Sequence, residues 1–236
     1  MPREGFLNAL VLGLCVAIAG IAIGIGFYEG RASERFVTVK GLAEREVSAD
    51  LAIWPITFKA AANDLAALQR EIDTGRGTIA AFLREAGFAE NEISYSAPRV
   101  TDVEAERARG MEARSQYRYT ADATVTARTK NVELVKKTME RSGELVGKGV
   151  ALAAYSWETP TEFLFTSLNA IKPEMIEEAT KDGRKAAEKF ARDSGSKVGK
   201  IRRATQGYFS IEDRDRNSPD LKNVRVVTTI DYYLVD

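Results

Sequence analysis

The residue types that carry out most enzyme chemistry are scarce in this 236-residue sequence. Histidine is absent, and the single cysteine, Cys15, lies inside an apolar stretch. Without histidine the chain lacks the commonest general base, the Ser-His and Cys-His nucleophile pairs and most zinc sites. Leu14 stands where a lipoprotein signal needs a small residue, so we interpret Cys15 as apolar filler and not as a lipidation site.

One segment places carboxylates at a spacing that resembles the start of a calcium-binding loop. Residues 213–217 read Asp-Arg-Asp-Arg-Asn. Such a loop needs glycine at its sixth position and glutamate at its twelfth, where this chain has Ser218 and Val224. Two arginines also separate the carboxylates. The sequence therefore favours a solvated hairpin loop over a calcium site.

Other candidate catalytic groups lack suitable neighbours. Three glutamates alternate with three arginines, which favours surface ion pairs over acid–base chemistry; they are Glu104, Glu106 and Glu112 with Arg107, Arg109 and Arg114. Ser94, Ser96 and Ser156 have no lysine at the spacing of a Ser-Lys hydrolase, the least favoured of our three functional hypotheses. The glycines at 75 and 77 lie inside a predicted helix, not in a phosphate-binding loop between strand and helix. We predict no catalytic residue, no metal ligand and no cofactor.

Four aromatic residues are candidates for a groove that binds a ligand or a second subunit: Tyr117, Tyr119, Tyr155 and Trp157. They occupy positions of predicted strands, which favours packing in the core or between subunits. A binding module for a small apolar or peptide ligand remains the alternative interpretation.

The charge balance argues against a polyanionic partner. Lys plus Arg and Asp plus Glu both number 34. Nucleic-acid binding depends on excess positive charge, so we predict no nucleic-acid partner.

These groups belong to two very different parts of the chain, and the first is an apolar stretch over residues 6–28 without a charged residue. At about 1.5 Å per residue a helix over this stretch rises about 35 Å, against about 30 Å for a membrane's hydrocarbon core. We predict a single transmembrane helix over 6–28, with a short N-terminal segment over 1–5 and a linker over 29–35.

Two properties of this stretch stay open. A cleaved signal peptide has a shorter apolar core, which favours a retained anchor, although Gly30-Arg31-Ala32 resembles a weak cleavage site. Arg3 flanks one side and Arg31 and Arg35 the other, so the flanking charges do not decide the orientation.

Small residues recur along one side of this predicted helix: Ala9, Gly13, Ala17, Gly20 and Gly24. Such a stripe lets two membrane helices approach closely, so we name it as a candidate helix-packing surface. The alternative is that glycine and alanine are simply common in such helices.

Beyond residue 35 the pattern is that of a folded domain, which we place at 36–236. Alternation of apolar and polar residues predicts strands over 36–47, 51–59, 93–103, 115–128, 150–166, 201–211 and 224–235. Apolar spacing of three and four residues predicts helices over 64–86, 132–142 and 173–194, with loops over 104–113 and 212–223.

Individual residues refine these elements. Pro55 predicts a sheet edge or a bulge in the second strand. Gly75 lies on the apolar stripe of the first helix and predicts close packing against a sheet, while Pro173 predicts the first turn of the third helix. The order ββαββαβαββ predicts an α+β fold with a mainly antiparallel sheet and helices packed on one face.

Several segments resemble the SIMPL-domain family of bacterial envelope proteins. The resemblance covers nearly all of residues 36–236 and is carried by VTVKG at 37–41, DLA at 50–52, LNAIKPEMIEEA at 168–179, AAEKFA at 186–191, SGSKVGKI at 194–201, QGYFSI at 206–211 and VRVVTT at 224–229. The last two resemble a membrane-anchored subgroup. Leu42-Ala43, Ala49 and Gly183 depart from the family pattern, which more often has Glu-Gly, proline and alanine there.

The resemblance implies an exported domain that forms rings or cages of many subunits, and it supplies no catalytic motif. Members are named for immunogenicity and for protection against oxidative stress. Exported location then implies a single-pass inner-membrane protein with its C-terminal domain in the periplasm. Our leading hypothesis is a non-enzymatic, membrane-anchored periplasmic protein that self-assembles into a homo-oligomer, as an envelope or stress-related scaffold.

Overall fold

The computed structural model describes residues 3–32, 35–110, 115–153 and 160–236, and within the first helix the side chains of residues 12–26. That helix, α1, spans Arg3–Ala32. No helix in the described part of the chain is both long enough and apolar enough to cross a membrane. The predicted transmembrane helix over 6–28 is therefore wrong, and the single-pass inner-membrane location built on it loses its support.

The chain forms two compact units, each assembled from separate segments. The first contains residues 1–45, 169–210 and 224–236, and the second contains residues 46–168 and 211–223. Each unit has its own antiparallel sheet, so the α+β class with antiparallel strands is confirmed, whereas the single sheet we expected is two.

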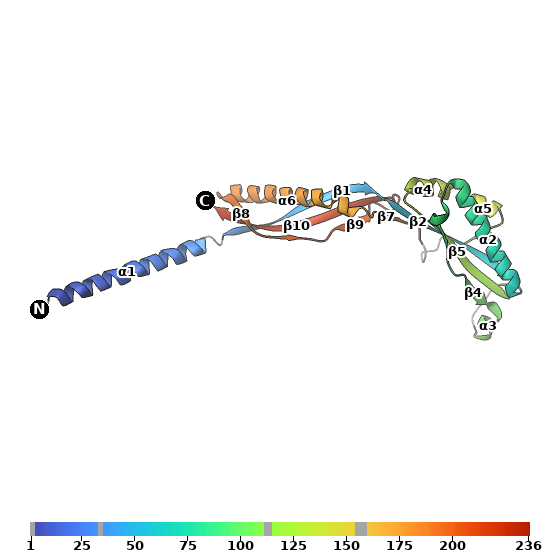
Figure 1. Ribbon diagram of the computed structural model, residues 1–236, viewed down its shortest axis with the longest axis horizontal. Coiled ribbons are helices and arrows are strands. Elements are labelled where there is room, and N and C mark those ends of the chain that lie inside the picture. The colour runs from blue at the N-terminus through green and yellow to red at the C-terminus, as the bar shows by residue number, and fades with distance from the viewer. Residues whose placement is uncertain (1–2, 33–34, 111–114, 154–159) are drawn as a thin grey trace. The chain divides into compact units, whose positions relative to one another are not determined.

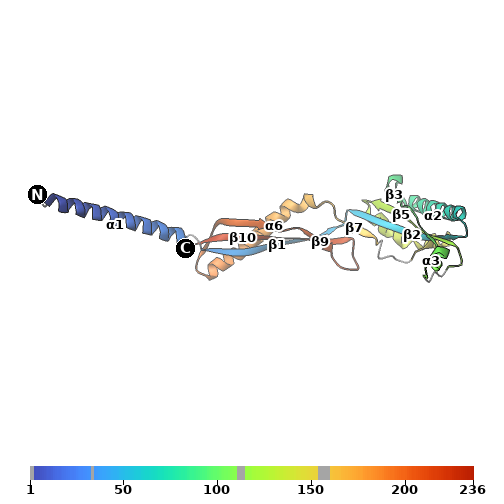
Figure 2. The same ribbon diagram turned by 90° about the horizontal axis from the view of Figure 1, so that it is seen from below.

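The sheet of the first unit has the strand order β1-β10-β8, and β9 also pairs with β10. The strands are β1 (Phe36–Ser48), β8 (Lys197–Gln206), β9 (Ser210–Asp213) and β10 (Leu221–Val235). β10 lies between β1 and β8. Its pairing with β8 is antiparallel, and the register is irregular near Tyr232. The helix α6 (Leu168–Asp193) lies along one face of this sheet, as two perpendicular views agree (Figures 1 and 2).

The helix α6 packs on this sheet through a stripe of mostly small residues at four-residue spacing: Met175, Ala179, Gly183, Ala187 and Ala191 are all buried. Against the last part of the stripe lie Val39, Ile230 and Tyr232. Phe190 is 62% exposed, although it lies three residues after Ala187 at the spacing typical of a buried helix face. Pro173 lies inside α6 and not in its first turn, because the helix already begins at Leu168.

Two facing glycines set the distance between α6 and β1. A Cβ atom on Gly41 would lie 1.8 Å from the carbonyl oxygen of Ala179 and 2.5 Å from the backbone nitrogen of Gly183. Both obstacles are backbone atoms, so no side chain can move aside. Only glycine at position 41 allows the helix and the strand to lie this close.

The sheet of the second unit has the order β3-β5-β2-β6, with β4 also on β5 and β7 also on β2. Its two long strands are β2 (Leu51–Ala62) and β5 (Tyr119–Thr129), which pair without a register shift from Ala52–Thr129 to Ala62–Tyr119. The short strands are β3 (Ile93–Tyr95), β4 (Arg99–Asp102), β6 (Ala151–Leu152) and β7 (Glu162–Leu164).

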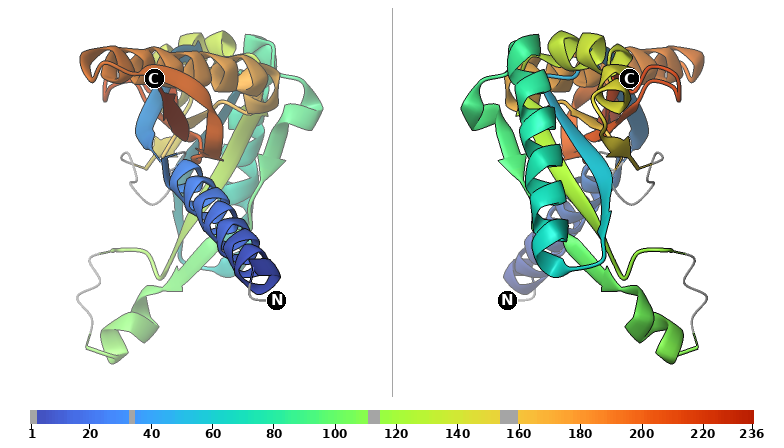
Figure 3. Two further views of the ribbon diagram at one scale, coloured as in Figure 1. Left: turned by 90° about the vertical axis from the view of Figure 1, so that its left-hand side faces the viewer. Right: turned by 90° about the vertical axis from the view of Figure 1, so that its right-hand side faces the viewer.

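Helix α2 (Leu65–Ala86) crosses β2 and β5 on one face of the second sheet (Figure 3, right). Alternate residues of the strands point toward it and are buried, from Ala52 to Phe58 and from Ala121 to Ala127. The carboxylate of Asp64 caps the start of the helix by accepting a hydrogen bond from the nitrogen of Ala67, and the helix ends at Gly87 with φ of 108°. A Cβ on Gly75 would lie 2.3 Å from the ring of Phe58, which confirms the predicted close packing.

The remaining helices of this unit are shorter than the sequence pattern indicates or were missed. The predicted helix over 132–142 is α4 (Val132–Glu140), and Gly143 opens a second helix, α5 (Gly143–Gly147), instead of closing the first. The charged segment after residue 103 forms α3 (Val103–Ala108), which Asp102 caps. A 3-10 turn, η1 (Glu90–Glu92), precedes β3.

Two predicted strands are interrupted. The strand over 93–103 is divided into β3 and β4, and that over 150–166 contains only β6 and β7 among the described residues. Pro55 lies in the middle of β2 opposite Thr126, in regular pairing, so the predicted bulge is wrong. On the other side of β2, the pairing with β7 ends at Ile53 and the pairing with β6 begins at Phe58. Pro55 therefore lies between these two short strands, at a position where no described strand pairs with β2 on that side.

Candidate functional site

The aromatic residues named as a possible groove are only partly described. Tyr119 packs against the core of the second unit, with the Arg118 guanidinium 5.1 Å from its ring centre. Tyr117 is 49% exposed. Tyr155 and Trp157 lie outside the described residues, so the groove remains a prediction.

The carboxylates tested as calcium ligands are instead paired with cations. Lys222, a buried lysine, is hydrogen-bonded to Asp213, and Arg214 bonds Asp215 at 2.8 Å and Glu46 at 3.2 Å. The bond from Arg214 lowers the pKa of Asp215. Among the described residues no group of three or more histidine, cysteine, aspartate or glutamate side chains could hold a metal ion.

The glutamates tested as acid–base groups lie on or near α3. Arg118 pairs with Glu104 at 3.3 Å and with Asp102 at 3.6 Å, and Arg107 donates to the carbonyl oxygen of Ser115 at 2.7 Å. Glu112 falls outside the described residues. The ion pair that the sequence predicted for Glu104 is present, although its partner is Arg118, further along the chain than the arginines we named.

Asp50 is a carboxylate whose role the sequence did not reveal. It accepts hydrogen bonds from the nitrogen of Thr166 at 2.7 Å, from its hydroxyl at 2.8 Å and from the nitrogen of Ser167 at 2.9 Å. Burial alone would raise its pKa, but these bonds from Ser167 and Thr166 outweigh burial and lower the pKa. Asp50 therefore fixes the turn between β7 and α6.

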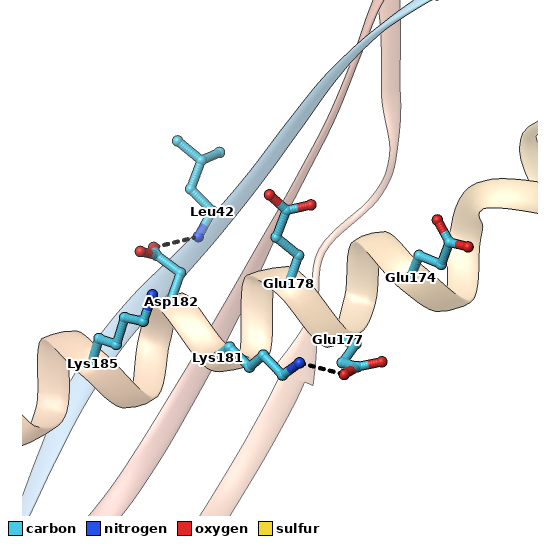
Figure 4. Close-up of a pocket in the computed structure, with 7 residues that line it drawn as sticks. All are labelled: Leu42, Glu174, Glu177, Glu178, Lys181, Asp182 and Lys185. Atoms are coloured by element: carbon cyan, nitrogen blue, oxygen red, sulfur yellow. Dashed lines mark hydrogen bonds and ion pairs between the residues drawn. The ribbon is translucent and has the colours of Figure 1, made fainter.

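A cluster of four carboxylates lies where α6 passes β1, and we call it the α6 rim: Glu174, Glu177, Glu178 and Asp182. With Leu42, Lys181 and Lys185 these residues line a surface pocket of about 310 Å³ (Figure 4). The carboxylate of Asp182 accepts a hydrogen bond at 3.0 Å from the backbone nitrogen of Leu42. This hydrogen bond joins α6 to β1 at the α6 rim.

Most of the rim's carboxylates are held by cations of the same unit. Arg45 bonds Glu174 at 2.8 Å and lies 3.7 Å from Glu178, and the bond to Glu174 raises the pKa of Arg45. Lys181 pairs with Glu177, whose pKa this bond lowers. Glu174 and Glu178 keep 69% and 55% of their side chains exposed.

The opposite edge of the same sheet is basic, and we call it the β8 edge: Lys197, Lys200, Arg202 and Arg203. All of β8 except Val198 and Gly199 is exposed. Arg202 stacks its guanidinium 4.1 Å from the ring centre of Phe36. In the described part of the chain Lys200, Arg202 and Arg203 have no carboxylate within the 4.0 Å of an ion pair.

The three glycines of the small-residue stripe of α1 have no neighbour among the residues that the structure describes. A Cβ on Gly13, Gly20 or Gly24 would meet no atom within 4 Å. Ala17 lies on the same helix, and the side chain of Ala9 is outside the described set. Helix packing through this stripe stays a prediction.

Together these features define an α+β protein with two antiparallel sheets and with charge gathered along the two edges of the first sheet. The family profile "SIMPL: Protein of unknown function (DUF541)" matches residues 37–227, so the chain belongs to the SIMPL family. The family that the sequence motifs indicated is thereby confirmed. No curated protein matches the chain.

Proposed function

We propose that this chain is a non-enzymatic, exported protein whose SIMPL domain self-assembles into a homo-oligomer. The observation that carries the proposal is the β8 edge. β8 is ten residues long, pairs only with β10 among the described strands and is exposed over almost its whole length. An open edge of this length presents unpaired backbone donors and acceptors to a partner strand.

The surroundings of two carboxylates in the described part of the chain support a structural role over catalysis. Asp50 is held by three hydrogen bonds, and Asp220 by Lys136 at 2.8 Å, which lowers its pKa. Carboxylates with lowered pKa values are poor proton acceptors at neutral pH, whereas catalytic bases are tuned toward neutrality. Both groups are therefore better suited to stabilising loops than to proton transfer.

The test of self-assembly is the particle size of the full-length chain. We expect sedimentation velocity in mild detergent to give a species of several subunits that persists on dilution. Detergent is needed because the apolar side chains of α1 from Leu12 to Ile25 are exposed and would associate non-specifically. A monomer at every concentration would contradict the proposal.

Export is tested separately, by fusing alkaline phosphatase to the C-terminus, because that enzyme becomes active only outside the bacterial cytoplasm. An active fusion is expected, and an inactive but stable fusion would contradict export. The role in the envelope or in oxidative stress is the least specific part of the proposal. It predicts that a strain lacking this protein survives peroxide less well than one complemented with it.

A further inference from the structure

The β8 edge carries features that restrict what can bind it. Four cations lie within seven residues, from Lys197 to Arg203, and the strand contains no proline. Ile201, between them, is 50% exposed. Pairing of this edge with itself in another copy would oppose cations to cations, which is unfavourable. The partner of the β8 edge must therefore present negative charge beside a strand or groove.

The other edge of the same sheet presents that charge. β1 is the outermost strand on that side, and the α6 rim lies next to it. The pocket of about 310 Å³ contains four carboxylates and two ammonium groups, and Leu42 adds a 37% exposed apolar side chain. The pocket has room for a cationic side chain, and its net charge is the opposite of that of the β8 edge.

We propose that the β8 edge of one copy docks on the α6 rim of a second copy, with Lys200 and Arg203 facing Glu174 and Glu178. This inference rests on the proposed self-assembly and names the surfaces that produce it. The two surfaces differ, so the contact is head-to-tail. Repetition of a head-to-tail contact closes a ring or extends a filament, whereas a self-complementary contact stops at a dimer.

A residue next to the β8 edge enlarges the contact. Tyr208 lies two residues after the end of β8 and is 100% exposed, although a tyrosine buries roughly 150–250 Å² when it is covered. Specific interfaces bury about 1,600 Å² in total, more than an exposed strand edge of this length provides. We assign Tyr208 as an aromatic anchor that becomes buried when the second copy binds.

The test reverses the charge of each surface in the full-length chain. The edge variant is Lys200→Glu with Arg203→Glu, and the rim variant is Glu174→Lys with Glu178→Lys. We expect each alone to weaken assembly about a hundredfold, because like charges then face each other. A control variant, Lys130→Glu with Lys137→Glu, makes the same change in charge as the edge variant, but on exposed lysines of the second unit, and should assemble normally.

Mixing the edge variant with the rim variant tests whether the β8 edge and the α6 rim contact each other. The edge variant and the rim variant together should assemble again, since each supplies the surface that the other needs, and a chain carrying all four changes should assemble alone. Circular dichroism and thermal melting establish that each variant is folded. High salt should weaken the wild-type assembly, because the facing charges are near the surface.

The outcomes separate the two proposals. A wild-type chain that never assembles overturns both self-assembly and this contact. A wild-type chain that assembles while the edge and rim variants assemble equally well overturns only the contact. Loss of assembly in both variants without recovery on mixing also overturns it, in favour of separate partners for the two surfaces.

Discussion

At the scale of single residues, close contacts with backbone atoms determine the packing of this protein more than titratable side chains do. Gly41 and Gly183 face each other between β1 and α6, and neither position is identified by hydrophobic periodicity. Gly183 is one of the departures from the family pattern, which more often has alanine there. A Cβ on Gly183 would lie 3.3 Å from the nitrogen of Gly41 and from Cδ1 of Ile230, a tight but adjustable contact.

Replacing Gly41 with alanine should therefore open the first unit, at a cost of about 3 kcal/mol. Hydrogen exchange of peptides from β1 and α6 measures this local opening. The matched control is Gly183→Ala, for which we expect less than about 1 kcal/mol because its obstacles lie at 3.3 Å. Equal exchange in the two variants would contradict the assigned packing.

Asp50 gives a prediction that depends on pH. Its pKa is lowered in the folded chain, so its contribution to stability is present above the ordinary aspartate pKa near 4 and is lost as pH falls through the lowered value. Asp50→Asn should cost about 2 kcal/mol at pH 7, because charge-assisted hydrogen bonds are lost. Urea unfolding of both chains at pH 7 and near pH 3 should show that the difference in their free energies of unfolding becomes smaller in acid. A difference that does not depend on pH would mean that the substitution acts through the shape of the side chain and not through its charge.

At the scale of elements, caps and periodicity predicted α2 well and α6 less well. Asp64 and Gly87 bound α2 as the sequence indicates, because capping is a local interaction between neighbouring residues. In α6 the buried stripe runs through Gly183 and leaves Phe190 exposed. Hydrophobic periodicity predicts the buried face of α6 poorly because the helix lies so close to the sheet that only small side chains fit between them. A large apolar side chain has no room there.

The two glycines inside α2 provide a matched pair of substitutions at the element scale. Gly75→Ala should destabilise the second unit by about 1–3 kcal/mol, since its Cβ would overlap the Phe58 ring at 2.3 Å. Gly77→Ala should stabilise it by up to about 1 kcal/mol, because that position is exposed and alanine is the better helix former. Thermal melting measures both, and changes of the same sign would refute the predicted arrangement of α2 on β2.

At the scale of the whole molecule, the chain passes between its two units several times. The family match over 37–227 includes residues of both, and the division falls inside β1, β9 and β10. Each unit has its own buried cluster, around Ile230 and Tyr232 in the first and around Phe58 and Val125 in the second. Neither unit is a continuous stretch of sequence, so the expectation of one domain over 36–236 remains a prediction.

A truncation tests whether the two units fold separately. A chain that ends at Asn223 lacks most of β10, the central strand of the first sheet. We expect peptides of α6 and β8 to lose protection from hydrogen exchange, whereas peptides of β2 and β5 keep theirs. Loss of protection in β2 and β5 as well would mean that the second unit depends on the first.

From the sequence alone, the family, the α+β class with antiparallel strands and the faces of the long strands were predictable, because alternation, capping and motifs are local properties. The division into two sheets was not, since an alternating strand buries one face whatever its partner. The tertiary structure alone decided which edges of the first sheet stay open and that an acidic rim lies across from a basic strand. It also assigned Gly41 and Asp50 their roles, because these depend on residues more than a hundred positions away.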